Sequence, residues 1–153
     1  FVSDNNLTLN IIGRLRSNNN NEKNFYKDIL KKNFRFFVPN EKNNQYDICD
    51  KSKLVVFIDS TLGYENMSRK NKTLGLSIRN EIINDHSFKF GWPKYFPLSG
   101  SSWTSTYNKK LIYKLLKNNF NKNKKNWNKI NKKYLKDLMV IKKNNLINNK
   151  IFK

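Results

Sequence analysis

The feature that most constrains this sequence is an apolar run, KLVVFI at residues 53–58, that turns polar without a spacer. Five of its six residues are apolar, and they do not alternate with polar ones. A run of this kind is typical of a strand covered on both faces, as in a parallel sheet. The residues that follow, DSTLGYE at 59–65, bring hydroxyls, a glycine and carboxylates. The sequence therefore predicts a buried strand that ends abruptly at a polar turn.

The segments on either side of this strand alternate between strand and helix patterns. We predict further strands over residues 7–15, 34–39 and 72–78, helices over residues 18–33 and 62–71, and a short helix or turn over residues 44–52. Such alternation predicts a three-layer α/β fold, in which helices cover both faces of a parallel sheet. Residues 80–106 have no clear period, so we expect a long irregular stretch that is either functional or flexible.

The C-terminal third is helical by its apolar period. One stripe holds Ile112, Leu115, Leu116 and Phe120, and a second holds Trp127, Ile130, Tyr134, Leu135 and Leu138. Apolar residues at these spacings form the buried face of a helix, so we expect the aromatic side chains to be core residues and not a base-stacking platform. We expect residues 107–153 to form additional basic helices packed on the same domain as residues 1–106.

The charge of the chain suggests an anionic partner but does not single one out. The net charge is +20, and residues 107–153 carry 15 of the lysines and one aspartate, a net +14. Such a surface suits nucleic acid or anionic lipid. Only 5 of the 31 basic residues are arginine, the residue that reads phosphates and bases with paired hydrogen bonds. A nucleic-acid-binding module built on these helices is therefore the alternative function. Codons rich in A and T would also account for the abundant lysine and asparagine and for the absence of alanine, without any functional role for the charge.

The scarcity of cysteine and histidine excludes several kinds of site. Cys49 is the one cysteine and His86 the one histidine, so the chain has no internal disulfide framework and no zinc site of the usual kind. We expect no metal and no cofactor, and a reducing, cytoplasmic location. No apolar run approaches the ~18–20 residues that cross a bilayer. His86 and Trp92 are weaker candidates, for acid/base chemistry and base stacking, and loop packing is their commoner role.

The polar turn after the apolar strand is the strongest candidate site. Ligands of open parallel sheets bind beyond the carboxyl ends of the strands, and the N–H groups that begin a following helix favour phosphate. Ser60 and Thr61 add hydroxyl donors there, and Gly63 lets a ligand approach the backbone. The alternative is that Ser60 or Thr61 caps the helix. Glu65 does not have capping-box spacing to either residue, so it is either a solvated first-turn acid favoured by the helix dipole or a ligand group whose carboxylate accepts hydrogen bonds from two vicinal hydroxyls, as on a ribose.

Residues 59–79, DSTLGYENMSRKNKTLGLSIR, resemble the donor-binding segment of GT-B glycosyltransferases. Together with FGWP at 90–93 and the G-x-x-W-T pattern at 100–104, the segment also resembles surface-carbohydrate (O-antigen) biosynthesis proteins. The resemblance covers roughly residues 8–106. It implies that residues 1–106 form a Rossmann-like domain that binds a nucleotide-sugar donor. The sequence departs from the family pattern at RKNK, residues 69–72, where the family tends to have Arg-Gly-Lys-Lys.

The resemblance also implies roles for particular residues. The matching positions are Gly13, Arg14, Ser60, Thr61, Gly63 and Glu65. Those in the polar turn would contact the phosphates, except Glu65, which would bind the ribose. Gly13 and Arg14 would face the same cleft, with Arg14 as the cation for the diphosphate. The acceptor site and the catalytic base would lie on a preceding N-terminal domain, which we expect because the chain begins FVSDNN without methionine.

Three functions thus remain open from the sequence. We favour the donor-binding half of a glycosyltransferase of surface polysaccharide biosynthesis, because only this function uses the turn at residues 59–65. Such a protein would work in the cytoplasm, with its lysines against the inner membrane face. The alternatives are the nucleic-acid-binding module, which we consider less favoured, and a domain that only docks a partner.

Overall fold

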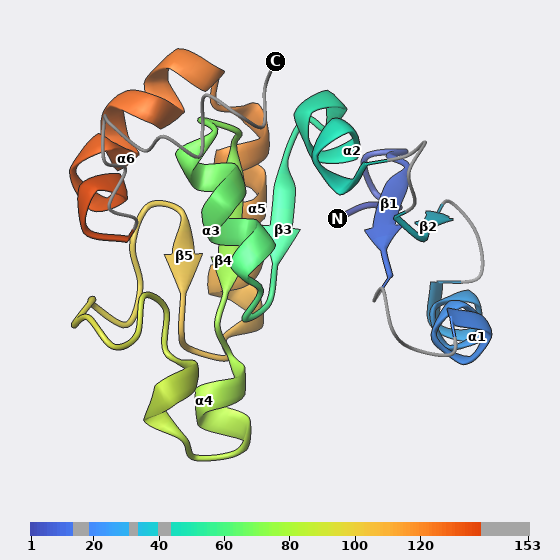
Figure 1. The fold of residues 1–153 in the computed structure, drawn as a ribbon, viewed down its shortest axis with the longest axis horizontal. Helices are drawn as coiled ribbons and strands as arrows, with labels where there is room; N and C mark the ends of the chain where they lie inside the picture. The colour runs from blue at the N-terminus through green and yellow to red at the C-terminus, as the bar shows by residue number, and fades with distance from the viewer. Residues whose placement is uncertain (14–18, 31–33, 40–43, 139–153) are drawn as a thin grey trace, which may run out of the picture. The chain divides into compact units, whose positions relative to one another are not determined.

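The computed structural model describes residues 1–13, 19–30, 34–39 and 44–138, drawn as coloured ribbon in Figure 1. The chain divides into two compact units, Phe1–Ser52 and Lys53–Lys153. The division falls just before the apolar strand, whereas the charge of the sequence changes near residue 106. That residues 1–106 act as one nucleotide-sugar-binding domain stays a prediction.

The first unit contains a two-stranded parallel sheet and two helices. Its elements are β1 (Leu9–Ile12), α1 (Asn19–Leu30), β2 (Phe34–Phe37) and α2 (Gln45–Lys51). Leu9 lies opposite Phe34 in the parallel register. The ring of Tyr26 on α1 packs against the ring of Phe36 on β2, with centroids 6.2 Å apart. These elements fall within the ranges predicted from the sequence.

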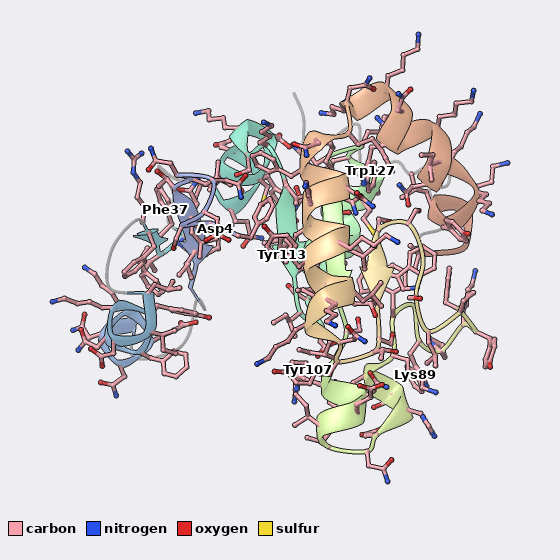
Figure 2. All side chains as sticks on the ribbon, turned by 180° about the vertical axis from the view of Figure 1, so that it is seen from behind. Asp4, Phe37, Lys89, Tyr107, Tyr113 and Trp127 are labelled. Carbon is pink, nitrogen blue, oxygen red and sulfur yellow. The ribbon has the colours of Figure 1, made fainter. Side chains whose placement is uncertain are left out.

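The second unit is a three-layer sandwich. Its elements are β3 (Val55–Phe57), α3 (Thr61–Ser68), β4 (Thr73–Leu76), α4 (Arg79–Ile82), the 3₁₀ turn η1 (His86–Phe88), β5 (Trp103–Thr104), α5 (Lys109–Asn121) and α6 (Lys124–Leu138). The strands are parallel in the order β3-β4-β5. Helix α3 covers one face of this sheet and α5 the other, as Figure 1 and the reverse view in Figure 2 show. The predicted α/β fold class, with additional C-terminal helices, is confirmed.

The core of the second unit is aromatic and lies between the sheet, α3 and α6. Its buried members are Phe57, Met67, Phe90, Trp103 and Trp127. The rings of Phe90 and Trp103 stack with centroids 4.8 Å apart and planes 8° apart. Trp127 is fully buried, which confirms that this aromatic residue of the basic helices belongs to the core. A base-stacking role for its ring is therefore excluded.

Buried asparagines join the helices to the loops of this unit. Asn131 on α6 accepts a hydrogen bond from the Ser102 hydroxyl at 2.5 Å, and its amide donates to the carbonyl of Trp127 at 2.9 Å. Asn119 on α5 donates to the carbonyl of Ser101 at 2.9 Å. The expectation that Ile130 lies on the buried stripe was wrong, since it is 40% exposed and Asn131 is buried instead. An aliphatic side chain there would leave the serine hydroxyl without this acceptor.

Two other expectations need correction. Strand β3 is not covered on both faces, because Val56 is 43% exposed and Ile58 52% exposed. The reason is that β3 is the edge strand of the three-stranded sheet, and α5 packs over its neighbour β4. Residues 80–106 are less irregular than predicted and contain β5, which at two residues is too short to give a periodic signal.

A lysine closes the C-terminal end of α5. The ammonium group of Lys72, which directly precedes β4, donates to the carbonyl oxygens of Asn119, Phe120 and Lys122 at 3.1, 2.8 and 2.7 Å. Carbonyls at the end of a helix have no partner within the helix and carry partial negative charge, so a cation there satisfies both needs. Partial burial and the nearby Lys53 lower the pKa of Lys72. This contact therefore ties the C-terminal end of α5 to the start of β4.

We predict that Lys72→Met lowers the free energy of unfolding by about 1–3 kcal/mol, because hydrogen bonds from a charged donor to the α5 carbonyls are lost. Urea unfolding of the whole chain measures the change. Lys117→Met, an exposed lysine on α5 itself, is the matched control and should change stability by less than about 0.5 kcal/mol. Equal effects of the two substitutions would show that the cap at Lys72 does not stabilise the fold.

Candidate functional site

The turn between β3 and α3 has an unusual backbone. Asp59 has φ +48°, a left-handed conformation that aspartate tolerates better than most residues. Ser60 follows as the N-cap, with extended backbone at φ −109° and ψ 130°, but its side chain makes no capping hydrogen bond. A capping role for the Ser60 hydroxyl is therefore not observed. This hydroxyl is half-buried beside the first turn of α3.

A hollow of about 310 Å³ lies beside that first turn. It is lined by Thr61, Tyr64 and Glu65 of α3, by Gly91 and Trp92 of the following loop, and by Leu138 at the end of α6. The hollow thus joins the STLGYE and FGWP motifs, which the sequence analysis singled out separately. Trp92 is 59% exposed, so its ring offers a free face and is not buried in loop packing.

Tyr64 fixes the wall of this hollow. Its hydroxyl accepts a hydrogen bond from the backbone N–H of Gly91 at 3.0 Å, which ties the loop to α3. Its ring packs against Phe57 and Phe90, with centroids 5.2 and 5.4 Å apart, and burial raises the pKa of its hydroxyl. Gly91 has φ +77°, and a Cβ there would overlap the ring of Phe96, so glycine is required at this position. The loop is therefore held in one conformation next to Glu65.

Polar side chains follow each of the three parallel strands. Asp59 follows β3, Ser77 follows β4, and Ser105 follows β5, where its hydroxyl accepts from the Phe90 N–H at 3.0 Å. Arg79 Nε lies 3.8 Å from Asp59 Oδ2. Burial raises the pKa of Asp59, while Arg79 and the Ser77 hydroxyl act to lower it. Yet neither Asp59 Oδ2 nor Ser77 Oγ has a hydrogen bond of normal geometry among the described residues.

Ser77 and Arg79 are not among the site residues predicted from the sequence. Both lie in the SIR stretch at the end of the predicted strand 72–78, where the same rule that singled out Asp59 applies. A polar residue directly after a buried parallel strand was thus the signal that the prediction did not use.

Of the predicted site residues, Thr61 and Glu65 come together. They lie one helical turn apart on the same face of α3, and both line the hollow. Gly63 lies instead on the buried face of α3, where a Cβ would overlap the ring of Phe57. Close packing of helix on strand therefore explains the glycine. The contacts of Ser60, Thr61, Gly63 and Glu65 with a nucleotide stay predictions.

The other two predicted residues belong to the first unit. Gly13 follows β1, its N–H donates to the carbonyl of Phe37 at 2.8 Å, and a Cβ there would come against the ring of Phe36. Arg14 lies outside the described residues. The roles proposed for this pair in binding a diphosphate stay predictions.

Within the described ranges, no group of three or more histidine, cysteine, aspartate or glutamate side chains is placed to hold a metal ion. Within the same part of the chain, no helix is both long enough and apolar enough to cross a bilayer.

Fold and site together define an α/β protein with a hollow beside α3, the helix that follows strand β3. The family model described as "putative O-antigen biosynthesis protein" matches residues 1–153, so the chain belongs to this family. No curated protein and no solved structure matches the chain. The resemblance to O-antigen biosynthesis proteins is thus confirmed, and the finer resemblance to a GT-B donor domain stays a prediction.

We predict that Gly63→Ala destabilises the second unit by about 1–3 kcal/mol, because the added methyl group overlaps the Phe57 ring. Thermal melts of Gly63→Ala and of the double variant Gly63→Ala/Phe57→Leu measure the effect. The smaller leucine leaves room for the added methyl group. Gly63→Ala should therefore lower the melting temperature less when it is added to Phe57→Leu than when it is added to the unchanged chain. A higher melting temperature for Gly63→Ala would mean that the ~1 kcal/mol gain in helix propensity dominates and that the close packing is not limiting.

Proposed function

We propose that this chain binds the nucleotide-sugar donor of a glycosyltransferase that acts in O-antigen biosynthesis. The observation that carries the proposal is the hollow beside α3, which combines a hydroxyl, a carboxylate and an exposed indole ring at Thr61, Glu65 and Trp92. These are the groups that phosphate, ribose and base require. The volume of about 310 Å³ is at the lower end of the range for ligand sites, so it suits the nucleoside part of the donor.

Each wall of the hollow matches a different part of a nucleotide. The Trp92 ring stacks on the base, a contact that tolerates any base because every base has a π face. Glu65 accepts hydrogen bonds from the two ribose hydroxyls. Thr61 begins α3, where free N–H groups and the helix dipole attract phosphate. A carboxylate next to the phosphates would repel them, so ribose is the consistent partner for Glu65.

The same arrangement serves the transfer reaction. The acceptor hydroxyl attacks the anomeric carbon of the sugar, and the nucleoside diphosphate leaves with the bonding electron pair. Negative charge grows on the leaving phosphate, where the first N–H groups of α3 and the hydroxyls of Ser60 and Thr61 stabilise it. In this proposal, the chain binds and orients the donor, and the acceptor and the base that takes its proton belong to another domain.

We predict that Glu65→Gln lowers the affinity for a nucleoside diphosphate about tenfold or more, because charged hydrogen bonds to the ribose contribute ~1.5–3 kcal/mol. Calorimetric titration with UDP, CDP and GDP measures the affinity, and a thermal melt confirms that the fold survives. Glu81→Gln is the matched control, since Glu81 accepts a hydrogen bond from the Tyr107 N–H that glutamine preserves.

Two results would contradict this proposal. If Glu65→Gln binds as tightly as the unchanged chain, the ribose role of Glu65 is wrong. If none of the three nucleotides binds the unchanged chain at millimolar concentration, donor binding by the hollow is wrong. If Glu81→Gln weakens nucleotide binding as much as Glu65→Gln does, any loss of negative charge has this effect.

The lysines of α5 and α6 support a place for this chain at an anionic membrane face. Their exposed members are Lys109, Lys110, Lys114, Lys117, Lys124, Lys125, Lys129, Lys132, Lys133 and Lys136. Each lysine near an anionic surface gains about 1 kcal/mol, and surface polysaccharide precursors are commonly assembled at the inner membrane face. Trp127 is buried, so its ring is not available for the base stacking that a single-stranded nucleic-acid site uses.

We predict binding to vesicles that contain anionic lipid, weaker at high salt, and no binding to neutral vesicles. Replacing Lys125, Lys129, Lys132 and Lys136 of α6 by glutamine should lower co-sedimentation at least about tenfold. The control replaces Lys23, Lys27, Lys51 and Lys94, which are exposed outside α5 and α6. Equal binding to neutral and anionic vesicles, or equal losses in both variants, would argue against a membrane surface on these helices.

A further inference from the structure

Arg79 is a cation at the carboxyl end of the parallel sheet, and its guanidinium group makes no hydrogen bond to the residues that the structure describes. It begins α4 three residues after β4 ends, and its side chain is 48% exposed. The guanidinium group lies over the ring of Phe88, 4.2 Å from the centroid. Its Nε is 3.8 Å from Asp59 Oδ2, which is too long for a hydrogen bond. Among the described residues, its N–H donors therefore have no acceptor.

Asp59 connects this cation to the N-terminal end of α3. The carboxylate precedes the N-cap Ser60 in the chain, and its side chain is only 11% exposed. The Ser77 hydroxyl beside it is 1% exposed and has no hydrogen bond of normal geometry. The same hydroxyl also lies close to Tyr64, which lines the hollow. Among the described residues, two polar atoms that lack a hydrogen bond of normal geometry, Asp59 Oδ2 and Ser77 Oγ, thus lie where α3 begins.

A purely structural ion pair would look different. A pair that stabilises the fold has short paired hydrogen bonds between guanidinium and carboxylate. Here the contact is long, the arginine is half-exposed, and Asp59 has a left-handed backbone. Strained backbone of this kind is often retained where a ligand binds. The arrangement therefore resembles a cation kept ready near its ligand.

We propose that Arg79 is the residue that binds the diphosphate group of the ligand at the N-terminal end of α3, and that Asp59 restrains this arginine until the ligand is present. This inference rests on the proposed function and extends it, because it names the cation that the sequence analysis assigned to Arg14. Asp59 acts here through Arg79 and is a positioning residue. Removing its charge should free the guanidinium and also remove its repulsion of phosphate.

The test uses the full chain and two probes, inorganic pyrophosphate and UDP. Arg79→Gln should weaken pyrophosphate binding about tenfold or more, and Arg79→Lys less. Asp59→Asn should bind pyrophosphate about twofold to fivefold more tightly, the size expected for a partly exposed ion pair. Asparagine also tolerates the left-handed backbone, so this variant should fold, and a thermal melt verifies it. The matched control is Arg69→Gln, an exposed arginine at the other end of α3.

The outcomes separate this inference from the proposed function. Failure of pyrophosphate to bind, or equal binding by Arg79→Gln and the unchanged chain, overturns the role of Arg79. If Asp59→Asn does not bind pyrophosphate more tightly than the unchanged chain, the restraint by Asp59 is wrong. If Arg79→Gln loses pyrophosphate but UDP binds no more tightly than pyrophosphate, the diphosphate site stands and the nucleotide proposal fails. If UDP binds and depends on Glu65 but not on Arg79, the proposed function stands and this inference fails.

Discussion

The second unit depends on one close contact, the packing of Gly63 on the ring of Phe57. Because glycine has no Cβ, α3 approaches β3 closely enough for the aromatic ring to fill the space between helix and strand. This approach brings the Tyr64 ring onto Phe57 and Phe90, and its hydroxyl to the Gly91 N–H. The wall of the hollow is therefore a consequence of how the helix sits on the sheet.

Buried polar groups give the rest of this unit its specificity. A two-residue strand such as β5 has few backbone hydrogen bonds of its own, so its position depends on side chains. Asn131 and Asn119 bind the serines that precede it, and the Trp103 indole donates to the carbonyl of Pro97 at 3.0 Å. These hydrogen bonds would be lost if the helices shifted, so they favour the observed arrangement of α5 and α6. That arrangement places the end of α6, with Leu138, beside the loop that carries Trp92.

The site gains its chemistry from the polarity of a parallel sheet. All three strands end at the same edge, so the polar residues that follow them gather there whatever their separation in sequence. Asp59, Ser77 and Arg79 meet for this reason, next to the helix end that attracts anions. The family match concerns O-antigen biosynthesis, and an activated sugar as the ligand at this edge remains a proposal that rests on the hollow.

The sequence by itself determined the class of the fold, and it singled out the turn at residues 59–65, beside which the hollow lies, as the candidate site. The KLVVFI run, the helical period of α5 and α6 and the polar turn at residues 59–65 are local patterns, and local patterns suffice to predict strands, helices and the residues after a strand. The sequence did not determine the exposure of Val56 and Ile58, the burial of Asn131 in place of Ile130, or the existence of β5. These depend on which strand lies at the sheet edge and which helix covers it. Only the tertiary structure brought Trp92 and Glu65 to one hollow and Arg79 to Asp59. These contacts join separate segments of the chain, and the spacing between the segments in the sequence does not predict that they meet.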